Sequence, residues 1–61
     1  MTFTLKIHTG NDAMATWYDI ANALRRIAEQ LQDLGDETVS IDSSVVMDSN
    51  GNRVGQWKVK P

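Results

Sequence analysis

The stretch MDSNGNRVGQW, residues 47–57, decides how the second half of the chain folds. Its Asn50-Gly51 step lies between two β-prone segments, and Asn-Gly in that setting is the strongest short-range signal for a β-hairpin. A calcium-binding loop would need an acidic ligand in place of Val46 and a glutamate in place of Trp57. A phosphate-binding glycine loop would need a helix after it, whereas a strand follows here. The stretch therefore predicts a turn rather than a ligand site.

Two pairing registers are compatible with this turn. A two-residue loop, Asn50-Gly51, places Ser44 opposite Trp57 and mixes polar with apolar side chains on both faces. A three-residue loop, Ser49-Asn50-Gly51, combines a type I turn with a left-handed glycine and puts Asp48 where such turns favour aspartate. It pairs Ile41 with Val59, Ser43 with Trp57, Val45 with Gly55 and Met47 with Arg53 on an apolar face, and Asp42 with Lys58 as an ion pair on the other. We favour this second register.

The first half of the chain predicts one strand and one helix. Residues 2–8, TFTLKIH, alternate, so Phe3, Leu5 and Ile7 share one side of a half-buried strand. An amphipathic helix follows, and either Asp12 or Thr16 could cap it; we favour Thr16, and Gly35 ends it. Its apolar stripe consists of Trp17, Ile20, Ala21, Leu24, Ile27, Ala28, Leu31 and Leu34. This stripe predicts that Trp17 lies in the core, and the hairpin register predicts the same for Trp57.

Together these elements predict a single α+β domain over residues 1–61. Its order is β-α-β-β, with one helix packed on a three-stranded sheet. A right-handed crossover makes the first two strands parallel, and the third strand lies between them, giving the order 1-3-2. Both outer strands are then open edges, which another chain could pair with. Edge pairing or stacking of helix faces would give a homodimer and relieve the shortage of core in so short a chain.

Composition argues against several classes of function. The chain has no cysteine and a single histidine, His8, so we expect no metal site and no cofactor. A formal charge of −2 makes nucleic acid an unexpected partner. No apolar run is long enough for a membrane span, and the N-terminus lacks the pattern of a signal peptide, so we expect a cytoplasmic location. No nucleophile, base and orienting group stand in a recognisable pattern, so we expect no catalytic residues and no enzyme.

Five residues are candidate partner contacts. Tyr18 lies just beside the apolar stripe of the helix, and Arg25 and Arg26 lie on its polar side. Lys58 and Lys60 lie on the polar face of the sheet. Their side chains suit a protein surface, or a nucleic acid if the chain forms a dimer.

The same hairpin carries a resemblance. The chain resembles small proteins of tailed phages and prophages, especially of actinobacteria, in which the C-terminal part reads D-x-N-G-N-x-V-G followed by an aromatic. The matching residues here are Asp48, Asn50, Gly51, Asn52, Val54, Gly55 and Trp57. The resemblance covers residues 20–35 and 48–57, and the chain departs from the pattern in its longer VSIDSSVVM strand.

The resemblance implies an origin more than a mechanism. Small phage proteins of this kind often act by binding and blocking a host protein, and some inhibit CRISPR or other defence systems. The first hypothesis is accordingly a non-enzymatic protein-interaction module that binds and modulates a host protein. The alternative is a small nucleic-acid-binding or regulatory protein that acts as a dimer.

Overall fold

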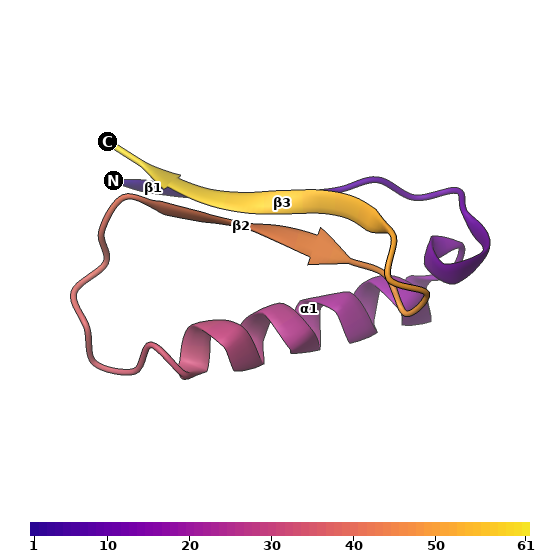
Figure 1. Ribbon diagram of the computed structural model, residues 1–61, viewed down its shortest axis with the longest axis horizontal. Helices are drawn as coiled ribbons and strands as arrows, with labels where there is room; N and C mark the ends of the chain where they lie inside the picture. Colours follow the sequence, from indigo (N-terminus) through magenta and orange to yellow (C-terminus); the bar gives the residue numbers. More distant parts are fainter.

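The predicted α+β arrangement is confirmed. A computed structural model describes residues 1–61, which form β1 (Thr2–Ile7), a short 3₁₀ helix η1 (Asp12–Met14), α1 (Trp17–Gln32), β2 (Asp42–Met47) and β3 (Arg53–Lys60). The sheet order is β1-β3-β2, and both neighbouring pairs are antiparallel. Figure 1 shows α1 running along one face of the sheet, with η1 near its N-terminal end and both chain termini at the opposite end of the molecule.

Helix α1 begins with the predicted capping box. The hydroxyl of Thr16 accepts a hydrogen bond from the amide of Asp19 at 3.1 Å, and the Asp19 carboxylate accepts from the amide of Thr16 at 3.0 Å and of Ala15 at 2.9 Å. The backbone hydrogen bonds from Ala15 and Thr16 hold the pKa of Asp19 below its ordinary value of 3.8. The alternative cap, Asp12, instead opens η1. α1 ends earlier than predicted, at Gln32 with Asp33 as its C-cap; Gly35, which was expected to end it, lies two residues beyond that cap and has a left-handed φ of 60°.

The inner face of the sheet forms where β1 and β3 pair. Phe3, Leu5 and Ile7 lie opposite Val59, Trp57 and Gly55. A side chain at position 55 would collide with the backbone carbonyl of Lys6. Glycine is therefore required there by close approach of two strands rather than by its φ angle.

The predicted hairpin turn is correct, but most of the predicted register is wrong. The amide of Gly51 donates to the Asp48 carbonyl, the amide of Asp48 donates to the Asn52 carbonyl, and Gly51 has a φ of 82°, as a three-residue loop requires. Met47 also pairs with Arg53 as predicted. Beyond that pair the register shifts by one residue, because Val54 has no partner on β2 and forms a β-bulge.

Because of the bulge, β2 presents to the core the face that was predicted to point away from it. The observed pairs are Asp42 with Val59, Ser43 with Lys58, Ser44 with Trp57, Val45 with Gln56 and Val46 with Gly55. Val46 is therefore buried, whereas Ile41 and Val45, which were expected inside, are exposed. The predicted ion pair between Asp42 and Lys58 is excluded, because successive residues point to opposite faces and Asp42 shares the inner face with Val59.

The face of α1 that packs on the sheet is also rotated from the prediction. Ala23 and Ile27 are the buried residues of α1. Trp17, predicted to lie in the core, is 87% exposed, and Leu24 is 44% exposed. The apolar stripe is wider than the contact with the sheet, so one side of the stripe is left uncovered.

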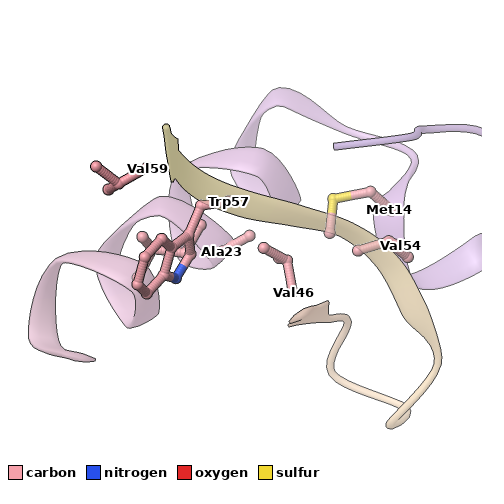
Figure 2. Packing of buried hydrophobic residues seen from close by; sticks show 7 residues of the cluster. Met14, Ala23, Val46, Val54, Trp57 and Val59 are labelled. Atoms are coloured by element: carbon pink, nitrogen blue, oxygen red, sulfur yellow. The ribbon is translucent and has the colours of Figure 1, made fainter. Parts of the chain in front are cut away.

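The core is small and is completed by a residue outside the predicted elements. It consists of Met14, Ala23, Ile27, Val46, Val54, Trp57 and Val59. Figure 2 shows the side chain of Met14 reaching from η1 toward Val54, and the indole of Trp57 directed toward α1. Met14 is the one large side chain with no exposed surface.

Trp57 is buried as predicted, and its polar atom is satisfied. Its indole N–H donates to the side-chain oxygen of Gln30 at 3.4 Å, while the amide group of Gln30 donates to the hydroxyl of Ser44 at 3.0 Å. Phe3 stacks on the Trp57 ring, with centroids 5.6 Å apart. Gln30 thus joins α1 to β2 and β3 without leaving a buried donor unpaired.

Candidate interaction surfaces

The polar groups of the hairpin turn are occupied by the turn itself. The side-chain oxygen Oδ1 of Asp48 accepts hydrogen bonds from the amides of Asn50 and Asn52, at 2.9 Å and 2.8 Å. Its Oδ2 accepts from the side chain of Asn11 at 3.2 Å, which ties the turn to the segment before η1. Because the Gly51 amide is also bonded, the three successive amides of Asn50, Gly51 and Asn52 are already used within the turn. The turn is a structural feature, as the sequence indicated.

These bonds also fix the charge of Asp48. The backbone hydrogen bond from Asn52 holds its pKa below the ordinary value of 3.8, with further bonds from Asn50 and Asn11 acting in the same direction. The Asp48 side chain is only 5% exposed. Its carboxylate therefore serves as the internal acceptor of the turn.

The histidine and acidic side chains do not form a cluster of metal ligands in the rest of the molecule. No three histidine, cysteine or acidic side chains lie close enough together to hold a metal ion. His8 follows β1, is exposed, and donates its backbone N–H to the carbonyl of Val54 at 2.7 Å. No helix is both long and apolar enough to cross a membrane.

The five predicted contact residues lie on separate surfaces. Tyr18 and Arg25 stand on the side of α1 that faces away from the sheet, and Arg25 donates to the side chain of Asn22 at 3.0 Å. Arg26 reaches β2, where it donates to the carbonyl of Met47 at 3.0 Å. Lys58 and Lys60 point from β3 to the opposite face of the molecule. They do not form one patch.

The outer face of the sheet is basic. Alternation along the strands places Lys6, Lys58 and Lys60 there, and Arg53 joins them by donating to Gln56 at 3.0 Å. The one acidic residue in the strands, Asp42, lies on the inner side. Lys6, His8, Arg53 and Gln56 line a shallow hollow of about 260 Å³. Charge is thus segregated, although the chain as a whole is acidic.

A groove runs between α1 and the open edge of β2. Its volume is about 180 Å³, and it is lined by Ala23, Arg26, Ile27, Gln30, Val45, Val46 and Met47. The lining is mostly apolar, and Arg26 and Gln30 supply polar groups from the helix. Sequence reasoning missed this groove because the predicted register placed Val45 and Met47 inside the core.

A second apolar surface follows the uncovered side of α1. We define the α1 seam as Trp17, Ala21, Leu24, Ala28 and Leu31. At the C-terminal end of the seam is a hollow of about 260 Å³ lined by Phe3, Leu31, Leu34, Gly35, Glu37, Thr38, Val39, Ser40, Asp42, Trp57 and Val59. The amphipathic pattern identified these helical residues as apolar but not as exposed.

Comparison with known proteins gives no relative from which a function could be transferred. No family model matches the chain, and no curated protein or solved structure matches it either.

Proposed function

We propose that this chain is a non-enzymatic protein-interaction module that receives an extended segment of a partner protein along the edge of β2. The observation that carries the proposal is the apolar groove between α1 and that edge. A strand at the edge of a sheet has backbone N–H and C=O groups free to pair with another chain. An adjoining groove can take alternate side chains of the added strand.

The groove has the two kinds of contact that such docking uses. Its floor contains the buried residues Ala23, Ile27 and Val46, and its rim contains Val45 and Met47, which are exposed. Burying exposed apolar area contributes about 25 cal/mol per Å², and backbone pairing fixes the direction of the bound segment. Side chains of the partner that point into the groove would therefore be apolar.

Arg26 adds a polar contact at one end of the groove. Its guanidinium donates to the carbonyl of Met47, so one backbone group at this end of the edge already has a partner. A guanidinium has more donors than this single bond uses. We therefore expect the bound segment to carry an acidic side chain or a chain terminus near Arg26, since a carboxylate is the partner that arginine binds best.

The source and location of the partner follow from the resemblance to small phage proteins. The expected partner is a host protein whose activity is modulated or inhibited by the added chain, with a component of a defence system as one example. The site of action would then be the host cytoplasm. The open groove supports a binding role. A pull-down would identify the target.

A pull-down from an actinobacterial lysate, read by quantitative mass spectrometry, tests this function. The test variant is Val45→Lys, which places a charge on the edge strand β2 beside the groove, where a lysine opposes the addition of another strand. Thr2→Lys is the matched control, because it adds the same charge to β1 at the opposite edge of the sheet. We expect the wild type and Thr2→Lys to recover the same protein, and Val45→Lys to lose at least tenfold of it. Equal recovery by Val45→Lys, or no specific protein with the wild type, would contradict the proposal.

The basic outer face favours a second candidate, the binding of a single-stranded nucleic acid. Lys6, Lys58, Lys60 and Arg53 can contact phosphates, although the face lacks the aromatic side chains on which bases stack. This face is separate from the groove, so each function can be tested alone.

Binding of a fluorescent oligonucleotide, measured at several salt concentrations, tests the second candidate. We expect Lys58→Glu to weaken binding severalfold and affinity to fall as salt rises, because each phosphate contact releases a counterion. Arg25→Glu is the control, since it makes the same charge change on the far side of the molecule. Equal weakening by both variants would show attraction to net charge alone.

A further inference from the structure

The α1 seam repeats as a coiled-coil interface does. Trp17, Ala21, Leu24, Ala28 and Leu31 are spaced alternately four and three residues apart, which keeps them on one side of a helix over its full length. No charged residue lies within the seam. Yet Trp17 and Leu24 are among the exposed large hydrophobic residues, and Ala28 is exposed as well. Leu31, at the C-terminal end of the seam, is half-buried against the core, so the packing within one chain leaves the seam from Trp17 to Ala28 largely uncovered.

Two copies of the α1 seam have complementary shapes when the two helices lie antiparallel. If two copies of α1 lie antiparallel, Leu24 can face the partner's Ala28, and Leu31 can face the partner's Ala21. Each large side chain then meets a small one, which is how facing helices interdigitate at close distance. Twofold symmetry repeats both contacts, because residue i meets j wherever j meets i.

The same register carries Trp17 to a hollow that can receive it. In that alignment Trp17 lies just beyond the C-terminal end of the partner's α1, where Leu34 and Gly35 line the hollow of about 260 Å³ at the end of the seam. That volume corresponds to roughly nine molecules of liquid water at about 30 Å³ each, which is enough space to receive an indole ring. The hollow is lined largely by apolar side chains, including Phe3, Leu31 and Leu34. An aromatic anchor in such a pocket is the usual centre of binding energy in an interface.

The chain exposes more surface than a compact monomer of its mass, as expected if part of that surface is covered by a partner. A folded monomer of 6.8 kDa exposes about 4,000 Å² by the scaling of area with mass, whereas this chain exposes 4616 Å². The surplus of about 600 Å² approaches the ~800 Å² that one subunit contributes to a standard interface. The radius of gyration is 12.2 Å, against about 10.5 Å for a compact chain of this length.

We propose that the partner of the α1 seam is a second copy of this chain, in a twofold dimer with antiparallel α1 helices and Trp17 of each subunit seated in the hollow of the other. This interface is distinct from the β2 groove, so the dimer and the binding of a partner protein can be present together. Its neutral seam also sets it apart from the basic outer face.

Sedimentation equilibrium of the full chain measures the dimer directly. We expect the wild type to approach twice the monomer mass of 6.8 kDa at about 100 μM and Trp17→Glu to sediment as a monomer. Tyr18→Glu is the matched control, because Tyr18 is also exposed in the first turn of α1 but lies outside the seam; it should remain a dimer. A glutamate in the first turn suits the helix dipole, so neither change should unfold α1. A monomeric wild type, or a dimeric Trp17→Glu, would overturn the proposal.

Cysteine cross-linking tests the register without relying on a disruptive variant. The chain has no cysteine of its own. In a Leu24→Cys, Ala28→Cys double variant, each new thiol should face its counterpart on the other subunit and give a covalent dimer on mild oxidation. An Arg25→Cys, Glu29→Cys double variant has the same spacing roughly a quarter of a turn around α1 from the seam, on the side that faces away from the sheet, and should cross-link at least tenfold more slowly. Comparable rates for the two variants would exclude this alignment of the helices.

Discussion

At the scale of single residues, Asp48 explains how a motif-like stretch is held as a hairpin turn. One carboxylate accepts two backbone amides of the turn and the side chain of Asn11, so it joins the β2–β3 hairpin to the segment before η1. The sequence predicted the position of Asp48 in the turn. The bond to Asn11 was beyond prediction, because the two residues are 37 positions apart.

The lowered pKa of Asp48 predicts a loss of stability in acid. A carboxyl whose pKa is lower in the folded than in the unfolded state stabilises the fold above about pH 4 and ceases to do so as pH falls through the folded value. Asp48→Asn should therefore be less stable than the wild type at neutral pH, and the difference should shrink below about pH 4. Urea unfolding at pH 7 and pH 3 measures it. A constant difference would show that the charge of Asp48 has no part in the effect.

Two glycines make a contrasting prediction. Gly51 has a left-handed φ with open space around it, so Gly51→Ala should cost about 1 kcal/mol. Gly55 abuts the backbone of Lys6, so Gly55→Ala must separate β1 from β3 and should cost about 3 kcal/mol or more. Chemical denaturation of both variants compares them. Equal costs would mean that β1 and β3 are not packed as closely as described.

At the scale of elements, the strands, the helix and its cap were predictable because each is specified locally. Thr16 and Asp19 are three residues apart, and the strand residues Phe3, Leu5 and Ile7 alternate within a single segment. Orientation was not predictable in the same way. The bulge at Val54 reversed the faces of β2, and a helix whose apolar stripe is wider than its contact can rotate to bury Ala23 in place of Leu24.

The orientation of α1 has a direct test in the cost of truncating its side chains. Ile27 is 7% exposed and belongs to the core, so Ile27→Ala should destabilise the chain by about 2–4 kcal/mol. Tyr18 is 70% exposed on the other side, so Tyr18→Ala should change stability by no more than about 0.5 kcal/mol. Thermal and urea unfolding provide the values. A larger effect for Tyr18→Ala would mean that α1 faces the sheet differently.

At the scale of the whole molecule, the chain divides its surface by chemistry. The outer face of the sheet is basic, the β2 groove and the α1 seam are apolar, and the small core lies between α1 and the sheet. A chain of 61 residues cannot enclose all its large apolar side chains, and here ten of them are exposed. Some of these side chains gather in the β2 groove and the α1 seam, which is why we propose those two surfaces as interfaces.

The two tryptophans allow the most direct test of this division. Hydroxyl-radical labelling with mass spectrometry reports on Trp17 and Trp57 separately in the unmodified chain. At low protein concentration we predict strong labelling of Trp17, which is 87% exposed, and little labelling of Trp57, which is 3% exposed. At high concentration Trp17 should become protected as the seam is covered. Labelling of Trp57 as fast as Trp17 at low concentration, or labelling of Trp17 that does not change with concentration, would contradict the account.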